Sequence, residues 1–225
     1  MEKSYKYLNA VSVFFVAVLL ISNVASSKIL DLHYFVFDGG TLLFPLSYIF
    51  GDILTEVYGY RRSRQVIWLG FFSALMMAVV FIVVGKLPAA ADWNNQAAYD
   101  QILGLTPRIV LASLVAYFCG EFLNSFILAK LKILTAGRWL WLRTIGSTVA
   151  GEFVDSLFFV LIAFAGVLPN SLLLTLIISN YFFKTAVEII FTPATYRVIS
   201  FLKKKEGEDF YDYQTDFNPF AKSSK

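Results

Sequence analysis

Six apolar runs, separated by polar loops, are the feature that most constrains the fold of this 225-residue chain. Each run is close to the roughly 20 residues that a helix needs to cross the hydrocarbon core of a bilayer. Hydrophobic residues make up 58% of the chain and charged residues only 16%, which is too apolar for an ordinary soluble domain. We therefore predict an all-α, polytopic membrane protein, a bundle of six transmembrane helices. The predicted spans cover residues 8–29, 42–57, 66–84, 108–131, 144–168 and 172–202.

The distribution of basic residues predicts how this bundle is oriented. Lys3 and Lys6 precede the first run, and basic clusters follow the second, fourth and sixth runs, whereas the other loops are poor in Lys and Arg. Because cytoplasmic loops are enriched in basic residues, both termini are expected to be cytoplasmic and the long loop 85–107 to lie outside. Residues 1–205 then form the transmembrane domain, and residues 206–225, which lack an apolar stretch, form an exposed cytoplasmic tail. The basic residues of the three clusters are Arg61, Arg62, Arg64, Lys130, Lys132, Arg138, Arg143, Lys203, Lys204 and Lys205.

Two carboxylates interrupt the second run. Asp52 and Glu56 are four residues apart, so they share one face of a helix. A charge in a membrane helix is costly and is usually kept only where it faces the bundle interior, a partner or a water-filled path. This makes the second run a candidate functional segment. The alternative is that both side chains lie among the cytoplasmic headgroups and pair with the arginines that follow this run.

A six-residue pattern, G-E-F-x-[ND]-S, occurs at residues 120–125 and again at residues 151–156. In each copy the Glu lies three residues before an Asn or Asp, which places Glu121 with Asn124 and Glu152 with Asp155 on one helix face. Since the fourth span descends and the fifth ascends, both copies are expected at similar depth on opposed helices. Transporter sites are often built where internal repeats meet near the midplane.

The sixth run adds Lys184 and Glu188, four residues apart, with Asn180 and Tyr181 close by. The candidate buried carboxylates then outnumber Lys184 by six to one, which a bilayer tolerates only with protonation, hydration or a ligand rich in hydrogen-bond donors. The alternative is packing alone, with some carboxylates paired to loop arginines such as Arg143. The six carboxylates are Asp52, Glu56, Glu121, Glu152, Asp155 and Glu188.

Other chemistries have little support in the sequence. The single histidine, His33, falls in a predicted loop and the single cysteine, Cys119, in an apolar run, so we expect no metal site, no cofactor and no internal disulfide. A zinc-protease motif would need two histidines, and no phosphate-binding G-x-x-x-x-G-K-[ST] loop occurs. We expect a protein that is not an enzyme, with an intramembrane enzyme and an ion channel as weaker alternatives.

Several longer motifs point to a known family. They run in order from GDILTEVYGY at residues 51–60, through GEFLNSFILAKLK at 120–132 and RTIGST at 143–148, to TPATY at 192–196 and NPF at 218–220. Together they resemble the queuosine precursor transporter family, also called the vitamin uptake transporter family. The resemblance covers about residues 22–220.

The resemblance implies a multi-pass protein of the cell inner membrane that imports 7-deazaguanine precursors of the tRNA base queuosine. The expected substrates are chiefly 7-cyano-7-deazaguanine and, as a second candidate, its 7-aminomethyl relative. Membrane lipid and a second copy of the chain are the candidate partners, and no nucleic acid is expected. The alternative is a substrate-binding subunit of an energy-coupling-factor-like transporter, which would need ATP hydrolysis by another chain.

Such a substrate has an N1–H and a 2-amino group that one carboxylate can accept together, and an O6 that needs a donor. We therefore predict that Glu152 or Glu121 binds the guanine-like edge beside Asp155, and that Asn124 and Lys184 donate to O6. Phe122 and Tyr181, with Phe153 and Tyr48, are expected to offer aromatic faces to the ring. Asp52, Glu56 and Glu188 are the predicted gate or proton-coupling residues.

Overall fold

The computed structural model describes residues 4–31, 36–104, 107–166 and 169–221. Two three-residue strands, β1 (Ile29–Asp31) and β2 (Val36–Asp38), pair antiparallel between the first two helices, and the 3₁₀ turn η1 (Gly39–Leu42) follows them. The α-helices are α1 (Leu8–Ala25), α2 (Phe44–Tyr58), α3 (Tyr60–Lys86), α4 (Gln96–Ile102), α5 (Pro107–Leu134), α6 (Leu140–Phe164) and α7 (Asn170–Glu206).

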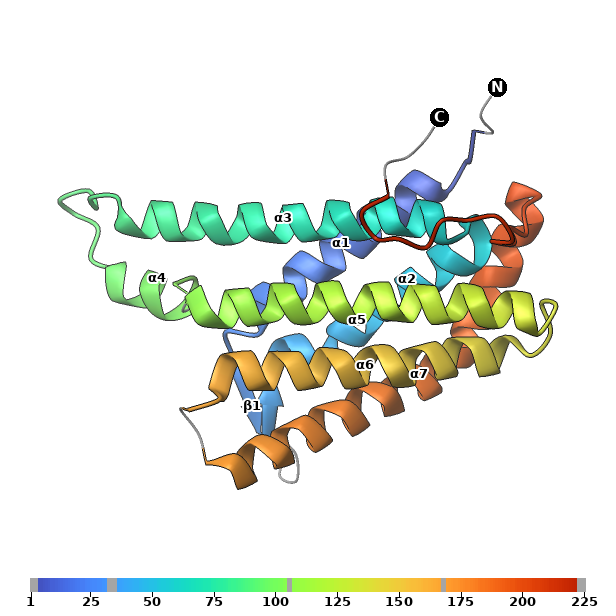
Figure 1. Cartoon of the computed structure of the whole chain (residues 1–225). Coiled ribbons are helices and arrows are strands. Elements are labelled where there is room, and N and C mark those ends of the chain that lie inside the picture. The colour runs from blue at the N-terminus through green and yellow to red at the C-terminus, as the bar shows by residue number, and fades with distance from the viewer. Residues whose placement is uncertain (1–3, 32–35, 105–106, 167–168, 222–225) are drawn as a thin grey trace.

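The long helices lie side by side and successive ones run in opposite directions (Figure 1). Both ends of the chain therefore lie at one end of the bundle, which we call the terminal end, and the β1–β2 hairpin lies at the other, the hairpin end (Figure 1). Pro45 in the first turn of α2 costs no helical hydrogen bond, and Gly207, in the left-handed region at φ 58°, ends α7.

Within the described residues, five helical segments are long and apolar enough to cross a membrane. The protein is accordingly a multi-pass, helical membrane protein. The predicted second span is also a helix, but α2 has only 15 residues and is roughly 22 Å long, which is short for the hydrocarbon core. The five segments are Leu8–Ala25, Tyr60–Lys86, Leu111–Leu134, Leu140–Phe164 and Leu173–Glu206.

The structure departs from the sequence-based prediction in the connections. A strand hairpin stands where a simple loop was expected between the first two spans, and the long loop contains the short helix α4. α3 begins at Tyr60, so the arginines after α2 belong to its first turns and not to a loop. Pro193 lies inside α7, and Figure 1 shows this helix changing direction along its length. His33 lies outside the described residues.

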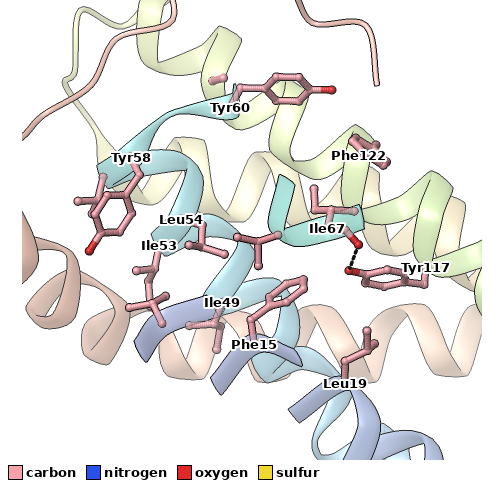
Figure 2. Close-up of a cluster of buried hydrophobic side chains, with 14 of the residues drawn as sticks. Phe15, Leu19, Ile49, Ile53, Leu54, Tyr58, Tyr60, Ile67, Tyr117 and Phe122 are labelled. Carbon is pink, nitrogen blue, oxygen red and sulfur yellow. Dashed lines mark hydrogen bonds between the residues drawn. The ribbon is translucent and has the colours of Figure 1, made fainter. Parts of the chain in front are cut away.

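A hydrophobic core holds α1, α2, α3 and α5 together (Figure 2). Phe15, Leu54 and Ile67 are completely buried in it, and the Tyr117 hydroxyl donates a hydrogen bond of 3.3 Å to the Ile67 carbonyl. Many large apolar side chains on the outer faces of the same helices are exposed, such as Phe14 and Met76, as expected of surfaces that meet lipid. A second, smaller cluster packs α6 against α7 through Val160, Leu173 and Ile177.

The segment after α7, which was predicted to be an exposed tail, packs on the terminal end of the bundle through some of its residues, while others, such as Tyr213 and Phe220, are exposed. The Asp212 carboxylate, which is buried, accepts hydrogen bonds of 3.0 and 3.2 Å from the Tyr60 amide at the start of α3. Trp68 donates to the Pro219 carbonyl at 2.9 Å, and Phe217 packs against the core. The physical reason is that polar groups and single aromatic residues hold this segment, and neither gives a hydropathy signal.

Candidate functional site

The two copies of the G-E-F-x-[ND]-S pattern meet face to face between α5 and α6. A Cβ added to Gly120 would lie 3.0 Å from the Gly151 carbonyl oxygen, and one added to Gly151 would lie 3.0 Å from the Gly120 carbonyl oxygen. The Cβ added to Gly120 would also lie 2.9 Å from the Cβ atom of Asp155, and the one added to Gly151 would lie 2.9 Å from the Cβ atom of Asn124. The absence of side chains lets the two backbones approach closely, as small residues do between membrane helices. The predicted juxtaposition of the copies is confirmed.

Lys184 forms the cationic centre of the site. Its Nζ atom lies 2.5 Å from Asp155 Oδ2 and 3.1 Å from Glu152 Oε2, and it also lies over the Phe44 ring. Lys184 is only 8% exposed and Glu152 is fully buried, so the three charges form an ion-pair group inside the bundle. Two carboxylates face one ammonium here, which leaves an excess of hydrogen-bond acceptors.

A pocket adjoins this ion-pair group on the side of the hairpin end. Its cavity volume is about 50 Å³, and the pocket is partly open to the surroundings. Aromatic, amide and hydroxyl side chains line it together with Lys184 and Asp155, a mixture that suits a planar, hydrogen-bonding ligand. The other lining residues are Asn23, Ser26, Gly40, Thr41, Phe44, Ser113, Ala116, Ser156, Phe159 and Asn180.

A layer of buried carboxylates lies next to the ion-pair group, toward the terminal end. Both side-chain oxygens of Glu121 and of Glu188 have no hydrogen-bond partner among the described residues, and both residues are at most 1% exposed. Asp52 accepts a hydrogen bond of 2.7 Å from Asn124, but its second oxygen is also unpartnered. Since buried polar groups are nearly always hydrogen-bonded, this layer is suited to donors that a ligand, water or bound protons supply.

Gly51 makes room for one of these carboxylates. A Cβ at this position would lie only 1.9 Å from Glu121 Oε1. Any residue larger than glycine at position 51 would therefore displace the Glu121 carboxylate. The sequence motif that begins with this glycine therefore shapes the carboxylate layer from the opposite helix.

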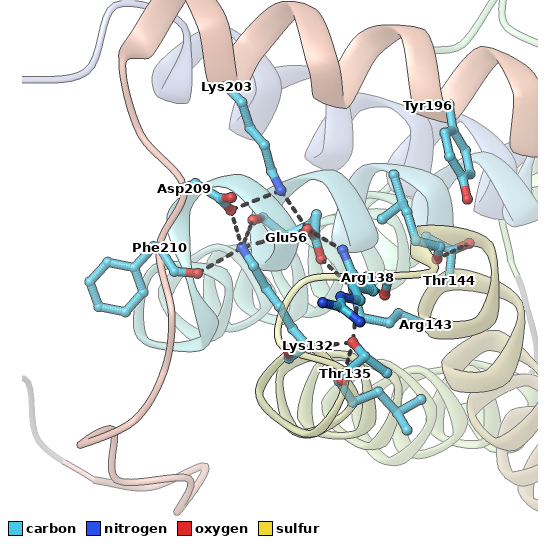
Figure 3. Close-up of polar contacts among 12 residues, drawn as sticks. Glu56, Lys132, Thr135, Arg138, Arg143, Thr144, Tyr196, Lys203, Asp209 and Phe210 are labelled. Carbon is cyan, nitrogen blue, oxygen red and sulfur yellow. Dashed lines mark hydrogen bonds and ion pairs between the residues drawn. The ribbon is translucent and has the colours of Figure 1, made fainter.

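Glu56 lies one helical turn further toward the terminal end, and its surroundings are different (Figure 3). Its carboxylate contacts Arg143 Nη2 at 2.7 Å, Lys203 Nζ at 2.6 Å and Lys132 Nζ at 3.5 Å. Asp209 joins the group through Lys132 at 2.6 Å and Lys203 at 2.8 Å. Glu56 is thus fully paired by residues from three other helices. The proposed pairing of a carboxylate with Arg143 holds for Glu56.

The structure brings most of the predicted site residues together, with exceptions. Glu121, Asn124, Glu152, Asp155, Lys184, Asp52 and Glu188 lie in the adjoining layers described above. Phe122 instead packs among Trp68 and Phe118, with its ring 4.7 Å from that of Phe118, and does not line the pocket. The physical reason is helix geometry, since a residue next to the inward-facing Glu121 points about 100° away from it.

The other aromatic residues predicted for the site also do not line the pocket. The Tyr181 and Phe153 rings meet edge to face at 5.9 Å, and Phe153 is 48% exposed, so this pair lies at the outer surface of α6 and α7. Tyr48 is buried, and its hydroxyl has no partner among the described residues. The aromatic side chains that line the pocket are Phe44 and Phe159, which sequence reasoning missed. The sequence signal that could have identified them is their spacing. Phe44 lies one helical turn from Tyr48 on α2, and Phe159 lies one helical turn from Asp155 on α6.

The described residues contain no group of three or more His, Cys, Asp or Glu side chains placed to hold a metal ion. The arrangement can accept hydrogen bonds from a neutral or cationic ligand and can take up protons on unpaired carboxylates. It places a pocket, a carboxylate layer and a closed ion-pair network in sequence along the bundle axis.

Three relatives are similar in sequence to this chain. A "Probable queuosine precursor transporter" of Bacillus subtilis (strain 168) is 31% identical over 179 residues, covering 78% of this chain and 77% of that protein. The "Queuosine precursor transporter" of Escherichia coli (strain K12) is 26% identical over 87% of both chains. A "Probable queuosine precursor transporter" of Haemophilus influenzae is 27% identical over 56% of this chain and 51% of that protein. No solved structure matches the chain.

The sequence pattern of one protein family, described as "Putative vitamin uptake transporter", matches residues 38–198. This range contains α2 to α6 and most of α7. It includes the buried carboxylates Asp52, Glu56, Glu121, Glu152, Asp155 and Glu188, whereas the buried Asp212 and the partly exposed Asp209 lie beyond it. Because the match covers well over half of the chain, and the Bacillus relative aligns over more than two thirds of it, this protein belongs to the vitamin uptake transporter family.

Proposed function

We propose that this protein imports queuosine precursors, chiefly 7-cyano-7-deazaguanine and also its 7-aminomethyl relative, across the cell inner membrane. The relatives' names support this substrate class. The structural observation that carries the proposal is the layer of buried carboxylates next to a pocket lined by aromatic and amide side chains. Five carboxylate oxygens of this layer have no hydrogen-bond partner within the described parts of the chain, both of Glu121, both of Glu188 and one of Asp52. A deazaguanine supplies adjacent N–H donors and a flat ring, which such a site requires.

In this proposal the bundle crosses the membrane six times with both termini in the cytoplasm. Counting α2 as a crossing is supported by its buried position among α1, α3, α5 and α7, because its neighbours shield it from lipid and compensate for its length. The basic residues near the terminal end support the cytoplasmic orientation. The pocket at the hairpin end then faces outward, and the Glu56 network faces the cytoplasm.

We assign roles to the site residues on this basis. Glu152 or Glu121 accepts the N1–H and 2-amino donors of the substrate. Lys184 has three N–H donors and uses two on Asp155 and Glu152, so the third remains for O6. The Asn124 amide donates to Asp52 and would have to exchange that hydrogen bond to reach O6. Glu188 and Asp52 are the proposed proton-coupling groups, and Glu56 the inner gate.

The test is uptake of radiolabelled 7-cyano-7-deazaguanine into liposomes that contain only the purified chain, with and without an inward proton gradient. We expect saturable uptake that Glu152→Gln reduces about 10-fold or more, because the amide removes one acceptor and the charge. Asp92→Asn, a carboxylate on the exposed loop before α4, is the matched control and should leave uptake unchanged.

The other outcomes distinguish the alternatives. Binding without uptake would indicate a substrate-binding subunit that needs an energising partner. The absence of both binding and uptake, in protein that is folded, would contradict the substrate assignment. Uptake that is the same with and without the proton gradient would indicate facilitated diffusion and remove the coupling role from Glu188 and Asp52.

A further inference from the structure

The segment after α7 contributes a charged residue to the network that closes the terminal end. Glu56 on α2, Lys132 on α5, Arg143 on α6 and Lys203 on α7 each come from a different helix, and Asp209 comes from the segment that follows α7 (Figure 3). Asp209 contacts both lysines, at 2.6 Å for Lys132 and 2.8 Å for Lys203. It therefore bridges α5 and α7 from the cytoplasmic side.

The charge balance of the network depends on Asp209. Three cations, Lys132, Arg143 and Lys203, converge on Glu56, which is fully buried. One carboxylate cannot neutralise three cations, and Asp209 is the second anion in contact with the two lysines. Although burial raises the pKa of Asp209, the hydrogen bonds from Lys132 and Lys203 hold it below its ordinary value, so the carboxylate is charged at neutral pH.

Neighbouring contacts fix this segment to α2, α3 and α5 independently of α7. Lys132 Nζ donates to the Phe210 carbonyl at 2.7 Å, and the Phe210 amide donates to the Val57 carbonyl at 3.4 Å. Asp212 accepts from the Tyr60 amide, a favourable place for a negative charge at the start of a helix. The Phe210 ring lies so close to Gly59, which has φ 86°, that a Cβ there would be 2.2 Å from Phe210 Cδ1.

The contact between Asp209 and Lys203 is consequently a connection between α7 and the anchored part of the bundle. α7 otherwise packs mainly on α6 and α2, and carries Lys184 and Glu188 of the site. A displacement of α7 at the terminal end would separate Lys203 from both Glu56 and Asp209. It would also open the carboxylate layer toward the cytoplasm.

We propose that the segment after α7 is part of the inner gate, with Asp209 as a latch that holds Lys203 of α7 and Lys132 of α5 over Glu56 until substrate leaves toward the cytoplasm. This inference rests on the proposed transport function and its orientation. It assigns a gating role to a segment outside the matched family region, which ends at residue 198.

The experiment measures how readily the interior is reached from the cytoplasmic side. Thr148 is buried on α6 between Arg143 and Glu152, and its hydroxyl has no partner among the described residues, so Thr148→Cys in a Cys119→Ala background is a conservative reporter. Inverted membrane vesicles would be treated with a membrane-impermeant maleimide. Loss of the hydrogen-bonded charge should raise the labelling rate about 10-fold in Asp209→Asn. Asp209→Glu should restore slow labelling.

Matched controls separate gating from misfolding. Asp216→Asn changes a carboxylate on the same segment that accepts a hydrogen bond from the nearby Asn218 amide, and it should label at the parent rate. Lys203→Met should label fast, and the double variant with Asp209→Asn no faster than the faster single variant, because both remove the same latch. A thermal unfolding midpoint within a few degrees of the parent would show that the variants are folded.

Two results would overturn the proposal: parent-rate labelling in folded Asp209→Asn, or additive effects in the double variant. The labelling needs no substrate, so a wrong substrate assignment leaves this result unchanged. Conversely, loss of uptake in Glu152→Gln without a change in labelling concerns the substrate site alone.

Discussion

Lys184 shows how a single buried charge organises this site. Its single positive charge contacts two adjacent carboxylates, Asp155 and Glu152, and so balances only one of their two negative charges. All three side chains are almost completely buried. The same residue lines the pocket, so a ligand bound there would lie next to the cation that pairs with both carboxylates.

Removing this cation is expected to destabilise the protein. Lys184→Met leaves two buried carboxylates side by side, and breaking a buried ion pair from one side costs about 3–5 kcal/mol. The unfolding midpoint in detergent should fall clearly for Lys184→Met and recover in part when Asp155→Asn is added. Lys86→Met, at an exposed position, is the control and should have no effect. An unchanged midpoint for Lys184→Met would show that the ion-pair group does not hold the helices together.

At the scale of elements, the pairing of α5 with α6 positions both copies of the repeated motif. Their backbones approach at Gly120 and Gly151, and each glycine meets the other helix's carbonyl oxygen. This contact sets the depth at which Glu121 and Glu152 face each other. Because backbone atoms form the contact, rotation of a side chain cannot relieve an added methyl group.

Gly151→Ala is therefore expected to destabilise the bundle by about 1–3 kcal/mol, the usual cost of overpacking. Gly146→Ala on the same helix is the matched control, since its Cβ would lie 3.5 Å from Leu131 Cδ1 in ordinary contact. That substitution should be neutral or slightly stabilising, because alanine favours helix over glycine by about 1 kcal/mol. Equal unfolding midpoints for the two variants would contradict the close α5–α6 contact.

For the whole molecule, the site features are arranged in order along the bundle axis. A pocket at the hairpin end, a layer of unpaired carboxylates and a closed charge network at the terminal end follow one another. This order resembles a transporter that is open to one side and closed to the other.

The crossing by α2 can be tested by the sidedness of single cysteines in a Cys119→Ala background. Ser4→Cys before α1 and Ala90→Cys after α3 are separated by three crossings if α2 spans and by two if it does not. We expect Ala90→Cys to react with an impermeant reagent in intact cells, and Ser4→Cys and Gln214→Cys only after permeabilisation. Reaction of Ser4→Cys and Ala90→Cys from the same side would exclude the six-span arrangement.

The sequence by itself determined the helical membrane fold and most members of the site. Apolar run length predicts the long helices, because a bilayer requires the backbone to satisfy its own hydrogen bonds. Carboxylates inside those runs, such as Asp52 and Glu121, stand out as candidates because their burial is costly. The repeated motif placed Glu121 and Glu152 at one depth, and the contact of Gly120 with Gly151 confirms it.

Only the tertiary structure decided which charges pair and which stay alone. Glu56 and Asp52 are one turn apart on α2 and equally buried, yet Glu56 meets three cations and Asp52 meets an amide. The aromatic walls of the pocket and the docking of Asp209 were likewise not predicted. Helical spacing fixes which residues share a face, but partners from distant segments depend on how helices rotate and pack, and a local pattern does not contain that information.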